Sequence, residues 1–107
     1  MKSNIYALTL FLVSLTTHAG ESRGFITNVF MHTPGVVLFG SGNILGTPVC
    51  NVSKQWGISM QDPMGKSMLA IILAAQAEGK QVVVKGYTNT CRDWPDRELP
   101  SYIVVID

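Results

Sequence analysis

The segment that follows residue 86 concentrates side chains that could recognise a ligand. Within eight residues it places two aromatic rings beside amide, cationic and carboxylate groups, namely Tyr87, Asn89, Arg92, Asp93 and Trp94. Aromatic rings next to hydrogen-bonding groups suit a recognition surface, such as one that stacks on a sugar ring. The alternative is that Trp94 packs over one end of the fold while Arg92 and Asp93 pair with neighbouring charges. These five are the candidate ligand-binding residues, and both interpretations stay open.

A nucleophile with its base is hard to assemble from this chain. The one histidine beyond residue 19 is His32, and the serine in the most suggestive setting is Ser41. A catalytic serine needs a base within reach, but Gly40-Ser41-Gly42 is above all a turn composition. We therefore interpret His32 as a surface or half-buried residue at a strand end.

The carboxylates of the same late segment do not indicate a hydrolase. Glycoside hydrolysis needs two carboxyl groups held about 5–10 Å apart in a cleft. Here Asp93, Asp96 and Glu98 follow one another beside Arg92 and Arg97, which favours a solvated, mutually paired loop. No phosphate-binding loop or dinucleotide fingerprint occurs. The sequence predicts a non-enzymatic protein without a cofactor.

Cys50 and Cys91 are the two cysteines of the chain. In an exported protein such a pair predicts a disulfide, and closing a loop of this length is worth about 4 kcal/mol. A zinc site is the alternative, but with His32 as the one accompanying histidine the ligand spacing is missing. Trp56 and the methionines beyond residue 19 are interpreted as core residues, and we predict no metal site.

The first nineteen residues have the pattern of a removable leader. Met1 and Lys2 form a short positive region, residues 5–15 are apolar, and Thr17-His18-Ala19 offers small residues at both recognition positions of signal peptidase. The apolar run is shorter than the ~20 residues that span a bilayer as a helix. We predict a signal peptide over 1–19, export to the periplasm or medium, and a mature start at Gly20 or Glu21.

Residues 20–107 are expected to form one domain. They carry seven basic and seven acidic side chains, so their net charge is zero with His32 neutral. Nucleic-acid binders usually show a basic excess, so we expect no nucleic-acid partner. No second long apolar stretch follows the leader, and we expect no membrane span in the mature chain.

The hydrophobic pattern predicts five strands and one helix. The strands are expected at 24–32, 36–39 with a resumption at 44–45, 56–60, 81–86 and 101–106. Asp62-Pro63 is a helix start and Gly79 a helix stop, with an apolar face that indicates a largely buried helix. The order β-β-β-α-β-β is that of a small OB-fold-like barrel.

A resemblance extends over residues 50–86. The stretch Cys50-Asn51-Val52-Ser53-Lys54-Gln55-Trp56-Gly57, a helix, and then Glu78-Gly79-Lys80-Gln81-Val82-Val83-Val84 resembles the B subunits of pentameric bacterial toxins of the subtilase-cytotoxin and pertussis-like type. That resemblance implies an OB-fold, secretion, a homopentamer, an A-type catalytic partner subunit and binding of host or surface glycans. It transfers no sugar-contacting residue to this chain. The alternative function is a periplasmic or secreted protein–protein interaction or inhibitor domain.

Overall fold

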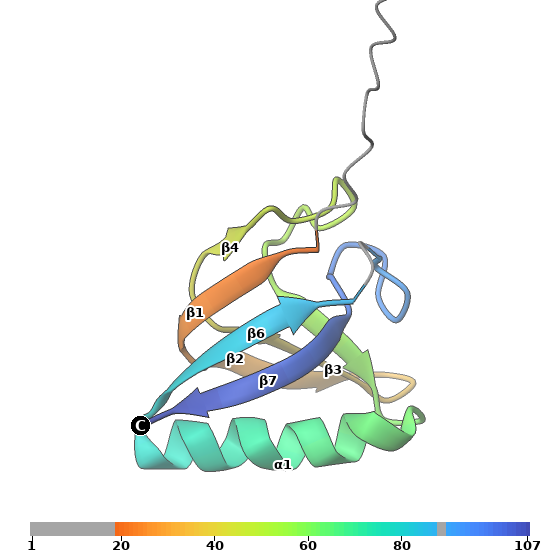
Figure 1. The fold of residues 1–107 in the computed structure, drawn as a ribbon. Helices are drawn as coiled ribbons and strands as arrows, with labels where there is room; N and C mark the ends of the chain where they lie inside the picture. The colour runs from red at the N-terminus through yellow and green to blue at the C-terminus, as the bar shows by residue number, and fades with distance from the viewer. Residues whose placement is uncertain (1–18, 88–89) are drawn as a thin grey trace, which may run out of the picture.

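The architecture is mainly β with one helix. The computed structural model describes residues 19–87 and 90–107, so the predicted leader lies outside the described residues except for Ala19. Figure 1 shows the elements in place. They are β1 (Glu21–Phe25), β2 (Thr27–His32), β3 (Val36–Gly40), β4 (Ile44–Leu45), β5 (Trp56–Ser59), α1 (Pro63–Glu78), β6 (Gln81–Gly86) and β7 (Pro100–Ile106).

The strands form two antiparallel sheets. The order is β4-β1-β6-β7 in the four-stranded sheet and β2-β3-β5 in the three-stranded sheet. Two expectations are therefore wrong: the described chain has seven strands instead of five, and strand pairing does not close the sheets into a barrel. One isolated parallel bridge, between Trp56 and Glu98, connects β5 to the segment that leads into β7.

The extra strands arise mainly where one strand was predicted over residues 24–32. The segment divides at Ile26, so that β1 pairs in one sheet and β2 in the other. Asn28 has a φ of 53°, and the register of β2 against β3 shifts between Thr27 and Phe30. Such an irregularity bends a strand and increases its twist. One nearly continuous segment can therefore serve both sheets.

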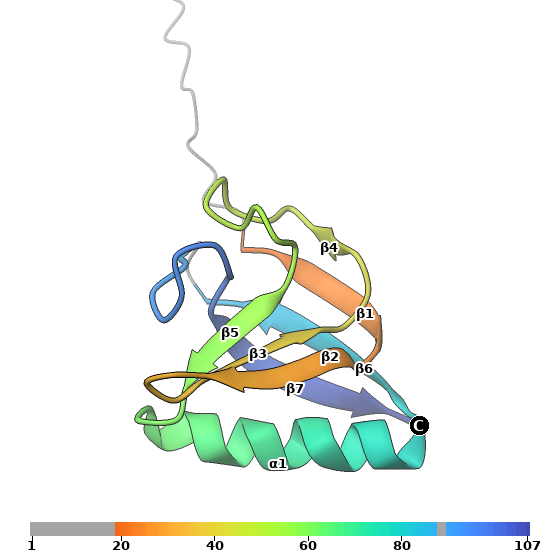
Figure 2. The same ribbon diagram turned by 180° about the vertical axis from the view of Figure 1, so that it is seen from behind.

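Helix α1 begins and ends where the sequence predicts. Asp62 has an extended backbone and its Oδ1 accepts the Met64 amide at 2.9 Å, with Pro63 in the first turn. Gly79 closes the helix with a φ of 64°, a conformation that glycine adopts without strain. Figures 1 and 2 show the helix running along one side of the molecule, beside β7 and below the three-stranded sheet.

The outer face of α1 differs from the prediction of a largely buried helix. The buried residues are Gly65, Met68, Ile72 and Ala75. Met64, Ile71 and Leu73 are exposed instead. Met31 is exposed as well, so the interpretation of the methionines as core residues fails for Met31 and Met64. The helix contributes one apolar stripe to the core and leaves apolar side chains uncovered on both sides of it: Met64 and Ile71 on one side, Leu73 on the other.

The core lies between the two sheets and the inner face of α1. Trp56 is fully buried, as predicted, among residues that include Phe39, Ile72, Val82 and Val84. A buried indole N–H needs a hydrogen-bond partner. Trp56 Nε1 lies 3.0 Å from both Ser22 Oγ and Ser41 Oγ, and these hydroxyls lie 2.6 Å apart. The hydrogen bonds among Ser22, Ser41 and Trp56 therefore connect β1, the residue that follows β3, and β5.

The predicted disulfide is confirmed. Cys50 and Cys91 are bonded, with Cα atoms 6.2 Å apart and a sequence separation of 41. The bond joins the segment after β4 to the segment between β6 and β7. No helix in the described part of the chain has the length and apolar character needed to cross a bilayer.

Candidate binding cleft

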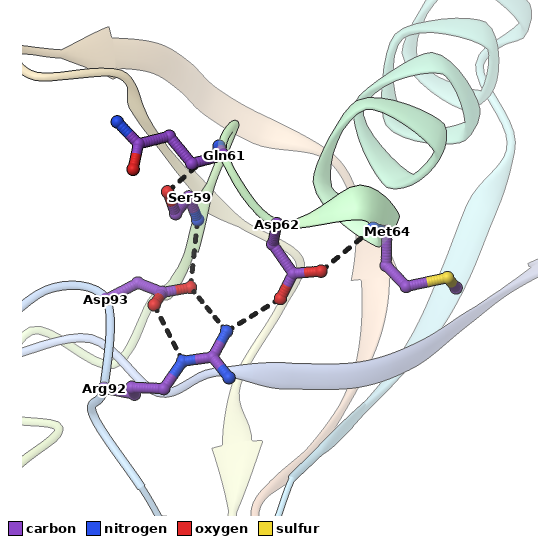
Figure 3. Close-up of polar contacts among 6 residues, drawn as sticks. All are labelled: Ser59, Gln61, Asp62, Met64, Arg92 and Asp93. Atoms are coloured by element: carbon purple, nitrogen blue, oxygen red, sulfur yellow. Dashed lines mark hydrogen bonds and ion pairs between the residues drawn. The ribbon is translucent and has the colours of Figure 1, made fainter.

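Arg92 is held by two carboxylates, as Figure 3 shows. Its Nε donates to Asp93 Oδ1 at 2.9 Å, and its Nη2 donates to Asp62 Oδ2 at 2.7 Å and to Asp93 Oδ2 at 3.3 Å. The side chain of Arg92 is 51% exposed, and ion pairs at exposed positions add little stability. What the two carboxylates provide is a fixed orientation of the guanidinium, whose Nη1 takes part in none of these bonds.

The two carboxylates belong to different parts of the fold. Asp62 caps α1, and the hydrogen bond from the Met64 amide, followed by that from Arg92, lowers the pKa of Asp62 below its ordinary value. Asp93 Oδ2 accepts the Ser59 amide at 3.0 Å, where β5 ends. Asp93 and Asp62 both raise the pKa of Arg92. The guanidinium therefore connects the 87–99 segment to the helix start and stays charged.

A cleft of about 240 Å³ opens beside this network. Its lining combines the exposed Tyr87 ring and the Arg92 guanidinium with apolar and hydroxyl groups; the lining residues are Asp62, Met64, Met68, Tyr87, Arg92, Leu99, Pro100 and Ser101. Tyr87 is 51% exposed. The cleft thus offers an aromatic ring, a fixed cation and a carboxylate at one opening.

The predicted ligand-binding residues fall into three groups. Tyr87 and Arg92 line the cleft. Asp93 does not line it but accepts a hydrogen bond from Arg92. Trp94 does not line it: its ring packs against His32 with centroids 4.6 Å apart and planes tilted by 52°. Asn89 lies outside the described residues. The contact of Trp94 with His32 is of the kind that the packing alternative describes, and the contacts of Arg92 and Asp93 are those of the charge-pairing alternative.

Asp62 and Ser101 line the cleft but are not among the five predicted ligand-binding residues. The sequence indicates a helix cap at Asp62, and a cap that also faces a nearby arginine cannot be identified without the tertiary fold. Ser101 Oγ donates to the Lys85 carbonyl at 3.2 Å. Its position at the start of the last strand, next to a loop rich in functional groups, is the one signal that pointed to it.

A second hollow of about 600 Å³ lies over the outer surface of β1, β4 and β6. It is lined by Ala19, Glu21, Ser22, Arg23, Asn43, Leu45, Gly46, Val83 and Lys85. Lys85 Nζ and Glu21 Oε2 are 3.8 Å apart across it. It holds none of the predicted site residues. Its signal in the sequence is the alternation of Glu21 and Arg23 along β1.

Ser41, His32 and Arg97 have structural partners. Ser41 is buried with Ser22 and Trp56, whereas His32 Nδ1 lies 2.8 Å from the Thr33 carbonyl oxygen. The pair Ser41–His32 is therefore not assembled. Arg97 Nη1 donates to Asp96 Oδ1 at 2.7 Å, in agreement with a mutually paired loop.

Glu98 contradicts the expectation of a solvated loop. Its side chain is completely buried and accepts hydrogen bonds from the Gly20 amide at 2.7 Å and from Thr47 Oγ1 at 3.1 Å. The chain reverses between Trp94 and Arg97, which form an isolated bridge. The last carboxylate of the loop consequently points inward, whereas the side chain of Asp96 stays 45% exposed.

Comparison with protein-family models, curated proteins and solved structures found no match to this chain. The resemblance to toxin B subunits therefore stays a prediction.

Proposed function

We propose that the protein is an exported, non-enzymatic binding module that takes a terminal sugar residue of a glycan in the cleft beside Tyr87 and Arg92. The observation that carries this proposal is the fixed guanidinium next to an exposed aromatic ring. Sugar rings offer apolar faces that pack on aromatic rings, and hydroxyl groups that accept from a guanidinium. The confirmed disulfide supports export, because such bonds persist in oxidising compartments.

The size of the cleft limits its ligand. About 240 Å³ is below the ~300–1,000 Å³ of pockets that enclose a whole small molecule. One ring of a glycan is therefore expected inside, with the rest of the glycan outside. Because Nε and Nη2 of Arg92 already donate hydrogen bonds to carboxylates, Nη1 is the donor that would bind the ligand. A preoriented donor loses little side-chain entropy on binding.

The strand connections support an OB-type order for this module. β2, in line with β1, pairs with β3, β3 pairs with β5, and β6 lies between β1 and β7, while α1 connects β5 to β6. The predicted order β-β-β-α-β-β is recovered only when β1 and β2 are counted as one strand and β4 as a continuation of β3, and the two sheets do not close. A toxin B-subunit-like role for the chain follows from that order only as a proposal.

A glycan array followed by calorimetric titration of the strongest ligand tests the proposal. Tyr87→Ala is expected to weaken binding at least about tenfold, which corresponds to 1.4 kcal/mol. Tyr102→Ala is the matched control, because Tyr102 is exposed to a similar extent but lies on β7 outside the cleft. Both variants should keep the melting temperature. A wild-type protein that binds no glycan, or equal losses in the two variants, contradicts the proposal.

A protein partner is the second candidate, and two uncovered apolar side chains of α1 favour it. They are Met64 and Ile71, which are seven residues apart and so lie on one side of the helix, and exposed apolar surface of this kind often marks an interface. We propose further copies of this chain as the occupant, with a pentamer as the expected state and an A-type subunit as its additional partner. Native mass spectrometry tests this, with Ile71→Glu expected to dissociate the oligomer and Lys66→Glu, on another side of the helix, as the control. A monomeric wild type contradicts it.

A further inference from the structure

Glu98 is a buried carboxylate whose two hydrogen-bond donors are both neutral groups. Oε2 accepts the Gly20 N–H at 2.7 Å and Oε1 accepts the Thr47 hydroxyl at 3.1 Å. Within the described residues, Glu98 forms no ion pair. The carboxylates that do so are Glu21, Asp62, Glu78, Asp93, Asp96 and Asp107. An ionised carboxylate removed from water is costly unless a cation compensates it. Among the described residues, Glu98 is therefore a buried carboxyl group with no cation paired to it.

The site is built closely around that carboxylate. A Cβ atom on Gly20 or on Gly86 would overlap the Glu98 carboxylate oxygens, so the site fits glycine at both positions. Gly20 is buried, and its carbonyl accepts the Gly86 amide at 2.7 Å, which extends the β1–β6 pairing by one residue. The nitrogen of Gly20 is therefore held in place by backbone pairing, facing Glu98.

Gly20 is also the residue that follows the Thr17-His18-Ala19 cleavage pattern. We propose that signal peptidase cuts the Ala19–Gly20 bond and that the new α-ammonium of Gly20 forms a buried ion pair with Glu98. In this hydrolysis the C–N bond breaks, water supplies the oxygen of the Ala19 carboxylate, and the released amine is protonated. An α-amine of ordinary pKa near 8 is charged at neutral pH.

The pair gives leader removal a structural consequence. Before cleavage, the Gly20 nitrogen is an amide that donates one neutral hydrogen bond; afterwards it supplies the missing positive charge at the same place. The processed domain is thus more stable than the precursor, and the mature start is Gly20, not Glu21. This inference rests on the proposed export, but it is independent of what the cleft binds.

The first experiment fixes the start of the chain. The full chain is expressed with its own leader in a bacterial host, and the exported product is analysed by intact mass and N-terminal sequencing. A start at Gly20 is expected. A start at Glu21 overturns the ion pair, and a retained leader overturns export itself, so the two failures are distinguishable. Glycan titration of the same material reports separately on the cleft.

The second experiment tests the charge pair by a double-mutant cycle. One serine inserted between Ala19 and Gly20 shifts the new amine away from Glu98 while leaving the cleavage pattern in place, which the intact mass verifies. We expect the unfolding equilibrium constant to rise at least about tenfold on insertion. In a Glu98→Gln background the same insertion should change it less than about threefold. Equal effects in both backgrounds refute the pair.

A third measurement covers the case in which Glu98→Gln does not fold. The wild-type product is treated with an amine-acylating reagent at neutral pH, and modification of Gly20 is compared with that of the exposed Lys66 by peptide mass mapping. We expect the Gly20 amine to react at least tenfold more slowly in the folded than in the urea-unfolded protein. Lys66 should react alike in both. A Gly20 amine that reacts equally in both states overturns the proposal.

Discussion

Replacement of both disulfide cysteines by serine removes a covalent loop closure and little else. Cys50 and Cys91 are separated by 41 residues and are half-buried. The chain entropy of a loop of that length corresponds to about 4 kcal/mol at 25 °C. We expect Cys50→Ser/Cys91→Ser to lower the free energy of unfolding by about that amount, which is a large part of the stability of a small domain.

The local contacts of the 87–99 segment should survive this change. The Leu99 amide still bonds to the Thr90 carbonyl at 2.8 Å, and Asp93 still accepts the Ser59 amide. The loss of stability should therefore arise in the unfolded state, which becomes more expanded without the crosslink. The cleft itself should keep its shape in the folded variant.

Urea unfolding followed by tryptophan fluorescence measures both effects. The variant should show the lower free energy together with a larger m-value, because m increases with the surface exposed on unfolding. Wild-type protein under a reductant provides the control and should unfold as the variant does. An unfolding free energy within about 1 kcal/mol of the oxidised wild type would refute the entropic reasoning.

Three further predictions concern the helix start and the core. Because the folded pKa of Asp62 lies below its ordinary value of 3.8, its charge stabilises the fold above about pH 4 and ceases to do so as the pH falls through the folded pKa. Asp62→Asn, which keeps a capping side chain, should therefore lose stability less steeply in acid; identical acid profiles of the melting temperature contradict this. Gly65→Ala should cost about 1–3 kcal/mol in thermal or urea unfolding, because the added Cβ would overlap the Ser59 carbonyl oxygen; an unchanged midpoint would argue against that close approach. Trp56→Phe should cost about 2–3 kcal/mol in urea unfolding, because it removes an indole N–H shared by two buried hydroxyls and leaves a void; a loss below about 0.5 kcal/mol would show that the indole bond contributes nothing.

Features set by a few neighbouring residues could be predicted from the sequence. Asp62, Pro63 and Gly79 define the helix ends through local backbone chemistry, and the structure places them as expected. Trp56 is a core residue because a large aromatic ring between apolar strand neighbours has its lowest free energy when it is buried. The pairing of Cys50 with Cys91 required only that no other cysteine competes.

Features that depend on distant segments could not be predicted. The division at Ile26 arises because one segment pairs in two different sheets, and neither Phe25 nor Thr27, on either side of Ile26, is a glycine or proline that would signal a break. Glu98 looks like its acidic neighbours in sequence, and only the arrival of Gly20 and Thr47 from far along the chain makes it a buried acceptor. The Arg92–Asp62 contact likewise spans 30 residues.

The end of β7 lies at the opposite end of the molecule from the cleft. Figures 1 and 2 both show the C-terminus beside the end of α1, while the cleft includes Asp62 at the start of that helix. Sixteen helical residues, about 24 Å, separate the two ends. A biotin acceptor peptide appended after the exposed Asp107 would therefore anchor the molecule to a sensor chip with Tyr87 facing the flowing solution.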